Sequence, residues 1–179
     1  VSRTVQLVDR AAGVCTPGRR DMRRSRCGLA GGGWPDGRVV CGGGCGISAK
    51  MWGPPVKGAA DATWTWRQLP AMSVARCGCR GCVMSDGRFA VLGGFSGGVA
   101  TSSCEALAIG DDDEHWEPLL PMHDPRAYFA CAAVAGCVIV AGGWGRNSAE
   151  VFDEVLGRWL RLLRGLPHNL GRWAARFCR

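Results

Sequence analysis

A period of about fifty residues constrains the fold more than any other feature of this sequence. Three glycine pairs mark it, Gly42-Gly43, Gly93-Gly94 and Gly142-Gly143, and they fall 51 and 49 residues apart. A short apolar run precedes each pair, and the first two runs come just after Asp36-Gly37 and Asp86-Gly87. Asp-Gly next to an apolar run is typical of a hairpin turn. The repeat therefore predicts a strand that ends at each glycine pair.

Tryptophan repeats at the same period in a second position. Trp66 and Trp116 are fifty residues apart, and Trp159 takes the corresponding place in the third copy. Between the glycines and the tryptophan lies another strand-like run, clearest at 148–153 and repeated at 103–107. Because these markers share one period, the sequence predicts about three copies of a unit with about four short strands.

One copy of the unit has the length of a membrane span. The segment from Ala127 to Trp144 has eighteen residues and no charge, so it has to be weighed as a transmembrane helix. Its copy from Cys77 to Phe95 carries three charged residues, which argues against a bilayer, and Val138-Ile139-Val140 favours a strand. We therefore expect the two strands of a hairpin here and no membrane association.

A fifty-residue unit with a double glycine, a downstream tryptophan and about four strands is typical of a kelch repeat, which forms one blade of a β-propeller. We therefore predict an all-β fold of about three kelch-type blades, which is an incomplete propeller. We expect the glycine pairs to lie in the innermost strands, where neighbouring backbones crowd, and the tryptophans to fill the gaps between blades.

Charge divides the chain into three parts. Residues 1–35 hold seven arginines and two aspartates, residues 36–154 hold nine basic and thirteen acidic residues, and residues 155–179 hold six arginines and no acid. Because the excess positive charge lies at the two ends, we interpret it as solvated flanks and expect no nucleic-acid partner. The predicted parts are a basic, disordered or degenerate segment at 1–35, kelch repeats at 36–66, 67–116 and 117–167, and a basic tail at 168–179.

Several short segments of the third copy carry a family resemblance. They are Leu120-Pro121-Met122, Arg126, 129–132, 138–143 and 148–153. These segments resemble the plant F-box/kelch-repeat proteins, and the resemblance extends from Asp36 to about Leu170. In that family an amino-terminal F-box docks onto the Skp subunit of a cullin ubiquitin ligase, and the propeller binds the protein to be ubiquitinated. The resemblance thus implies a protein-interaction module that recognises the substrate of a ubiquitin ligase.

Two features depart from that family. We find no F-box ahead of the first repeat, so a Skp or cullin partner is implied only if an F-box lies outside the printed sequence. Three blades also do not close a ring, which leaves edge strands unpaired. The chain is then a fragment, pairs with another chain or folds poorly alone, and we favour a truncated chain or a degenerate, non-functional kelch protein.

Eleven cysteines raise the question of disulfides, zinc or redox chemistry. The odd number, with no Asn-x-Ser/Thr acceptor and no amino-terminal signal sequence, favours a reducing compartment, so we expect a cytoplasmic or nuclear protein. Cys77-x-Cys79-x-x-Cys82 has partial zinc spacing, but its copy at 127–132 is a predicted strand, whose side chains alternate between two faces. We therefore predict no zinc and keep cysteine-based redox sensing as an alternative function.

The sequence favours a binding protein over an enzyme. The three histidines, His115, His123 and His168, lie close to a proline or a tryptophan, and none has a serine or cysteine at a catalytic spacing. The acidic run at 111–114 lacks the alternating ligands and glycine of a calcium loop, and the glycines at 42–46 lack the Lys-Ser/Thr of a phosphate loop. We expect no catalytic residue, cofactor, metal or small-molecule ligand.

A protein partner would meet the loops at one end of the propeller. Arg76, Arg126 and Tyr128 lie just before equivalent strands, and members of the family often contact their partners through such positions. We therefore predict these three residues as the partner-binding site. The alternative is that each arginine pairs with an acidic residue of the next blade.

Overall fold

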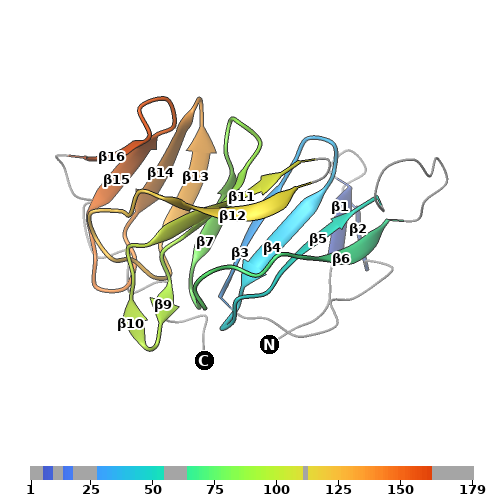
Figure 1. Ribbon diagram of the computed structural model, residues 1–179, viewed down its shortest axis with the longest axis horizontal. Helices are drawn as coiled ribbons and strands as arrows, with labels where there is room; N and C mark the ends of the chain where they lie inside the picture. The colour runs from blue at the N-terminus through green and yellow to red at the C-terminus, as the bar shows by residue number, and fades with distance from the viewer. Residues whose placement is uncertain (1–5, 10–13, 18–27, 55–63, 111–112, 163–179) are drawn as a thin grey trace.

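The structure is a computed structural model, and it describes residues 6–9, 14–17, 28–54, 64–110 and 113–162. Within these residues every regular element is a β-strand, and three four-stranded antiparallel sheets follow one another along the chain (Figure 1). Blade 1 contains β3 (Leu29–Gly33), β4 (Val39–Gly43), β5 (Ala49–Gly53) and β6 (Thr65–Leu69). Blade 2 contains β7 (Arg80–Val83), β8 (Phe89–Leu92), β11 (Cys104–Ile109) and β12 (Glu114–Leu119). Blade 3 contains β13 (Ala130–Val134), β14 (Cys137–Ala141), β15 (Ala149–Asp153) and β16 (Arg158–Arg161).

Two short hairpins accompany the blades. The strand β1 (Gln6–Asp9) pairs with β2 (Val14–Pro17), and β9 (Phe95–Ser96) pairs with β10 (Val99–Ala100). The predicted all-β class is confirmed, and so is an incomplete propeller of three blades.

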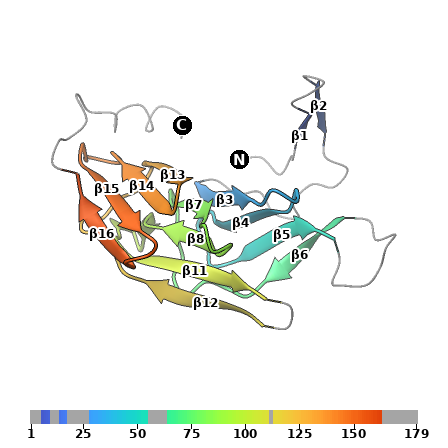
Figure 2. The ribbon, with the colours of Figure 1, turned by 90° about the horizontal axis from the view of Figure 1, so that it is seen from above.

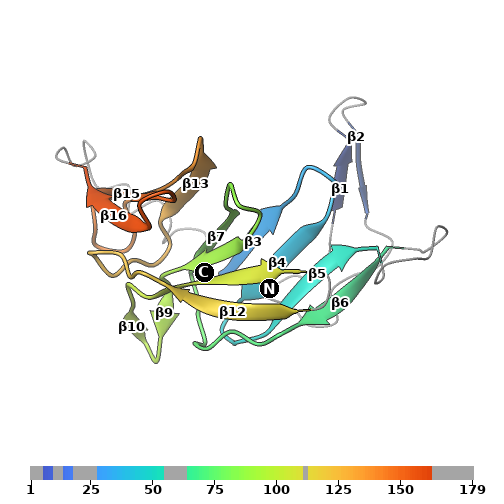
Figure 3. The same cartoon turned by 45° about the horizontal axis from the view of Figure 1, so that its top comes forward.

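The blades form an open fan. The first strands lie near its centre, with β7 between β3 and β13, and the fourth strands β6, β12 and β16 lie at its outside (Figure 2). Figure 3 shows the same fan tilted, with blades 3 and 1 at its two ends. Strands run up and down in sequence order, so the loops after β4, β8 and β14 share one end of the fan with the linkers 70–79 and 120–129. We call this end the linker end and the opposite one the turn end.

The strand β8 builds two cores at once. Side chains alternate along a strand, so Phe89 and Val91 pack against blade 1 while Ala90 and Leu92 pack against blade 3. All four residues are buried. A central strand with apolar residues on both faces appears in the sequence as an unbroken apolar run, which is why this strand was predictable.

Blade 3 leaves an apolar row open. Ile139 takes the place in β14 that Val40 has in β4 and Ala90 has in β8. Val40 and Ala90 are fully buried against the following blade, whereas Ile139 is 37% exposed. Val151 and Leu160 continue the same row across β15 and β16. The position that makes the core in blades 1 and 2 therefore faces solvent in blade 3.

Tryptophans of the outer strands join neighbouring blades. Nε1 of Trp116 donates to the carbonyl oxygen of Pro70 at 2.9 Å, and Nε1 of Trp159 donates to that of Leu120 at 2.8 Å. Both acceptors lie in the linker that follows the preceding blade. Trp66, in blade 1, has no such acceptor among the described residues, and its Nε1 is buried.

The predicted hairpin turns are confirmed. Oδ1 and Oδ2 of Asp36 accept from N and Nε of Arg38 at 3.0 and 2.7 Å, and Asp86 holds Arg88 at the same two distances. The glycine between each pair has a φ of 92° or 87°, a conformation that residues with a Cβ rarely adopt. In blade 3 the two-residue turn Ala135-Gly136 replaces this motif.

The structure corrects two parts of the prediction for the glycine pairs, namely which residues form the first pair and on which strands the pairs lie. Gly43, Gly93 and Gly142 are the equivalent residues, because each donates its N–H to the carbonyl of the serine just before the third strand. The pair in blade 1 is therefore Gly43-Gly44, one residue later than the predicted Gly42-Gly43. The pairs end the second strands, so their predicted place in the innermost strands is wrong. The reason is conformational, since the six glycines have φ values between 54° and 115°, which close the loop at the strand end.

The first predicted boundary is also corrected. The strand β3 begins at Leu29 and pairs with β4 along its whole length, so blade 1 begins ahead of residue 36. The prediction of a disordered or degenerate segment at 1–35 is wrong for these residues. Three of the five residues of β3 are glycines, which conceal strand character in the sequence, and Ala30 is fully buried in the core. The predicted basic tail at 168–179 lies outside the described residues.

The uncharged segment from Ala127 to Trp144 contains the hairpin of β13 and β14. Their register runs from Ala130 opposite Ala141 to Val134 opposite Cys137. The prediction of two strands is therefore confirmed. Among the described residues, no helix is long and apolar enough to cross a bilayer.

Val140 and Ile139 are adjacent in β14 but face opposite sides, so a matched pair of substitutions tests the packing. Val140→Asp places a carboxylate in the core between blades 2 and 3, and we expect it to lower the free energy of unfolding by about 3–5 kcal/mol. Ile139→Asp places the same group at a partly exposed site, and we expect a loss below about 1 kcal/mol. Urea unfolding followed by tryptophan fluorescence measures both. Equal losses would contradict the assignment of the two faces.

Candidate protein-binding face

Two buried arginines organise the linker end. Arg76 and Arg126 occupy equivalent places in the two linkers, and they are 1% and 0% exposed. Nη1 of Arg126 donates to the carbonyl oxygens of Gly142 and Ser148 at 2.8 and 2.7 Å, and Arg76 makes the two equivalent bonds in blade 2 at 2.9 and 2.8 Å. Each arginine therefore ties the end of the second strand to the start of the third.

A buried glutamate of the third strand neutralises each arginine. Nε of Arg76 lies 3.1 Å from Oε1 of Glu105, and Nη2 of Arg126 lies 3.0 Å from Oε1 of Glu150. The N–H and the ring Nδ1 of His123 lie 2.7 and 2.8 Å from Oε2 of Glu150. A buried charge is costly unless it is paired and hydrogen-bonded, and both conditions are met here.

The hydrogen bonds around Glu150 also set its acidity. Burial acts to raise the pKa of Glu150, but bonds from His123, Arg126 and the N–H of Asp124 outweigh it and hold the pKa below its ordinary value of 4.5. The carboxylate is thus ionised near neutral pH, where it balances the guanidinium.

The geometry does not support a partner-binding role for Arg76 and Arg126. Neither side chain has the exposed surface that a contact requires, and each is held by a glutamate of the blade that its linker enters. The ion-pair alternative describes them correctly. Their burial was not predictable from the local sequence, because charged side chains are mostly exposed unless they are paired.

Tyr128, the third predicted contact residue, occupies a position that is glycine in the two preceding repeats. Gly28 and Gly78 hold the same place in the preceding repeats, with φ values of 58° and 68°, and Tyr128 has a φ of 53°. The N–H of Gly78 donates to the carbonyl of Gly28, and that of Tyr128 to the carbonyl of Gly78, both at 2.8 Å. The ring of Tyr128 lies on Gly78, where a Cβ would approach its Cζ to 2.9 Å.

Three aromatic side chains form a cluster at this position. The ring centroids of Phe95 and Tyr128 are 6.0 Å apart, and those of Phe95 and Trp144 are 6.4 Å apart in an edge-to-face arrangement. Trp144 is 57% exposed, while Phe95 and Tyr128 are partly buried. We call Phe95, Tyr128 and Trp144 the aromatic cluster, which joins blades 2 and 3 at the linker end.

The sequence prediction included Tyr128 but missed the other two members of the cluster. A signal was present, because Phe95 and Trp144 each follow directly after a glycine pair. Such a residue leaves the sheet at the point where the backbone turns outward, so it is well placed to reach the surface.

The cysteines of the predicted partial zinc motif point to different neighbours. Sγ of Cys77 lies 2.8 Å from Sγ of Cys45, whereas Sγ of Cys79 lies 3.6 Å from the carbonyl oxygen of Gly28. Cys82 is hydrogen-bonded to Cys131 in blade 3. In the part of the chain that the structure describes, no group of three or more His, Cys, Asp or Glu residues is arranged to hold a metal ion.

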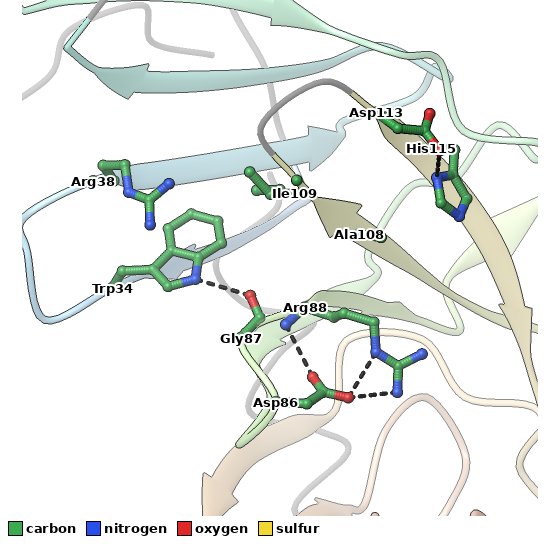
Figure 4. A pocket seen from close by; sticks show the side chains of 10 residues that line it. Trp34, Arg38, Asp86, Gly87, Arg88, Ala108, Ile109, Asp113 and His115 are labelled. Carbon is green, nitrogen blue, oxygen red and sulfur yellow. Dashed lines mark hydrogen bonds and ion pairs between the residues drawn. The ribbon is translucent and has the colours of Figure 1, made fainter. Parts of the chain in front are cut away.

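A hollow lies at the turn end, between blades 1 and 2 (Figure 4). It has a volume of about 450 Å³, and Trp34 lies at its wall with Nε1 donating to the carbonyl oxygen of Gly87 at 2.9 Å. Its charged groups already have partners, since Arg88 pairs with Asp86 and the ring of His115 with a neighbouring aspartate (Figure 4). We therefore place the candidate site at the linker end, where aromatic surface is exposed.

The comparisons with known proteins agree with this architecture. Residues 125–162 match the kelch motif, and they include Arg126 and all of blade 3. The chain contains kelch repeats. Blades 1 and 2 have the same four-stranded order as this kelch blade. Kelch repeats typically bind other proteins and do not catalyse reactions, so the kelch blades form a protein-interaction module.

Two F-box/kelch-repeat proteins of Arabidopsis thaliana are similar to this kelch chain. One is 30% identical over 115 residues, which cover 54% of this chain and 30% of the relative. The other is 29% identical over 129 residues, which cover 68% of this chain and 30% of the relative. The chain thus matches only about 30% of the length of these relatives. The predicted resemblance to plant F-box/kelch-repeat proteins is confirmed for their kelch portion.

Arg126→Ala separates the structural role of this arginine from a contact role. The substitution leaves Glu150 buried without its guanidinium, so we expect the free energy of unfolding to fall by about 3–5 kcal/mol. Arg158→Ala, at an exposed position of β16, is the control and should change stability by less than about 0.5 kcal/mol. Urea unfolding at neutral pH measures both. An Arg126→Ala chain as stable as the control would return the arginine to the list of contact residues.

Glu150 also predicts a dependence of stability on acid. Because its pKa is lowered in the folded state, its contribution is present above the unfolded value of 4.5 and is lost as pH falls through the folded pKa. Below about pH 4.5 the free energy of unfolding of the original chain should therefore fall more steeply than that of Glu150→Gln, which cannot titrate there. Urea unfolding at a series of pH values measures the two slopes. Parallel slopes would show that Glu150 is not held by these hydrogen bonds.

Proposed function

We propose that this chain is the substrate-recognition part of an F-box adapter of a ubiquitin ligase, and that the aromatic cluster is its contact surface. The observation that carries the proposal is the exposed Trp144, which lies edge-to-face against Phe95 at the linker end of a kelch fan. Tryptophan and tyrosine are enriched among the residues that dominate binding energy at protein interfaces.

The cluster is supported by a rigid base. Tyr128 is fixed by its N–H bond to Gly78, and the N–H of Trp144 donates to the carbonyl of Ala127 at 2.8 Å. Side chains held in one arrangement lose less conformational entropy when a partner binds. The partner is accordingly a protein with an apolar or aromatic side chain that fits against Trp144.

The ligase part of the proposal rests on the relatives. Both similar proteins are named F-box/kelch-repeat proteins, and this chain matches only their kelch portion. An F-box encoded with these blades would dock onto a Skp subunit and bring the bound protein to a cullin complex. Such an adapter works in the cytoplasm or the nucleus, which is where we place this chain.

Trp144→Ala tests the contact surface. The substitution removes an exposed ring, so we expect the fold to remain and the capture of partners from a plant extract to fall about tenfold or more. Leu156→Ala, equally exposed at the turn between β15 and β16, is the matched control and should capture the same proteins as the original chain. Quantitative mass spectrometry of the captured proteins is the readout. If Trp144→Ala and the control capture the same set, the aromatic cluster is not the contact surface.

The ligase role needs a separate test. The complete coding sequence, expressed in plant cells, should co-purify with a Skp subunit, and its loss should raise the level of the proteins captured through Trp144. A complete protein that binds no Skp subunit would limit the proposal to protein binding.

A further inference from the structure

Two thiols face each other beside the aromatic cluster. Sγ of Cys45, in the loop after β4, lies 2.8 Å from Sγ of Cys77, in the linker before β7. Cys45 is exposed and Cys77 is partly exposed. Sγ of Cys77 is also 3.8 Å from the hydroxyl oxygen of Tyr128. The pair therefore connects blade 1 to the linker against which the ring of Tyr128 lies.

The backbone brings these two cysteines close together. Gly46 and Arg76 form an isolated antiparallel bridge, and the N–H of Cys45 donates to the carbonyl oxygen of Arg76 at 2.9 Å. Cys45 and Cys77 are the chain neighbours of this bridge. Because their backbones are joined beside the thiols and their Sγ atoms lie 2.8 Å apart, a disulfide between them needs little movement of the chain.

The other thiols near this linker are less suited to oxidation. Burial raises the pKa of the Cys79 thiol, and burial also raises that of Cys104 to about 11. A hydrogen bond with Cys131, together with burial, raises the pKa of Cys82. Oxidants react with the accessible thiolate, so buried thiols of raised pKa react slowly. The exposed pair is thus the favoured site among these cysteines.

We propose that Cys45 and Cys77 are a redox modification site, which a hydroperoxide oxidises to a disulfide that clamps blade 1 to the linker under Tyr128. One molecule of hydrogen peroxide takes two electrons and two protons from the two thiols, which leaves one S–S bond and two molecules of water. A dithiol reductant reverses the step. Because Cys77 contacts Tyr128, the state of this pair acts on the proposed contact surface, and this second effect rests on the proposed function.

The disulfide is tested first without any partner. One equivalent of hydrogen peroxide should give a chain in which peptide mapping finds Cys45 joined to Cys77. Closing this loop constrains the unfolded chain, so we expect the melting temperature to rise by about 5 °C or more over the reduced chain, and dithiothreitol should reverse the rise. Cys45→Ser should abolish both results, while Cys137→Ser, at a partly buried thiol of blade 3, should leave them unchanged. A disulfide between Cys45 and any other cysteine, or an unchanged melting temperature, would overturn the proposal.

The effect on the contact surface is then measured with the same chain. Partner capture by the oxidised and reduced forms should differ at least about threefold, and the difference should disappear in Cys45→Ser. Equal capture would overturn the regulatory step but leave the disulfide standing. The proposed contact surface and the proposed redox effect are tested separately. The contact surface is tested by Trp144→Ala under reducing conditions, and the redox effect by comparing the oxidised and reduced forms of the original chain.

Discussion

The linker end depends on a charge that is buried between two blades. The side chain of Arg76 holds the carbonyl of Gly93 in blade 2, while its own carbonyl accepts the N–H of Cys45 in blade 1. The same arrangement recurs in the linker between blades 2 and 3, where the carbonyl of Arg126 accepts the N–H of Gly94 at 2.7 Å. Each linker thus binds the blade before it with its backbone and the blade after it with its guanidinium. Replacing one such arginine removes the guanidinium bonds to the following blade and leaves that blade's glutamate buried without its partner, while the backbone bond to the preceding blade remains.

Blade 1 shows what happens when this arrangement is incomplete. Lys50 lies opposite Cys41, at the place in the register that Glu105 and Glu150 hold in the other blades. A lysine there cannot accept the hydrogen bonds of a buried arginine. The indole N–H of Trp66 is also without an acceptor in the described part of the chain, whereas its two counterparts are bonded. Blade 1 therefore carries a lysine at the position where blades 2 and 3 use a glutamate to hold the preceding linker.

The sequence predicted what depends on local pattern. The glycine pairs, the Asp-Gly turns and the apolar runs fixed the blades, because each follows from the conformation of a few adjacent residues. Burial of Arg76 and Arg126 depends on glutamates 29 and 24 residues further along, so no local pattern revealed it. The strand β3 was missed for a related reason, since its glycines form a strand only through pairing with β4. Trp144 was missed because its exposure results from the outward turn at Gly143.

The aromatic cluster does not require a closed ring. Phe95 is bonded to Cys77, Tyr128 to Gly78 and Trp144 to Ala127, so backbone bonds to the two linkers hold the three members, and their rings pack on one another. The open row of Ile139, Val151 and Leu160 lies on the face of blade 3 opposite the one on which Val140 and its neighbours form the core. Side chains alternate across a strand, so covering or uncovering that row leaves the core-facing positions in place. The geometry of the proposed contact surface is therefore set by the two linkers and by the packing of blade 2 on blade 3, and it does not depend on what covers the open row.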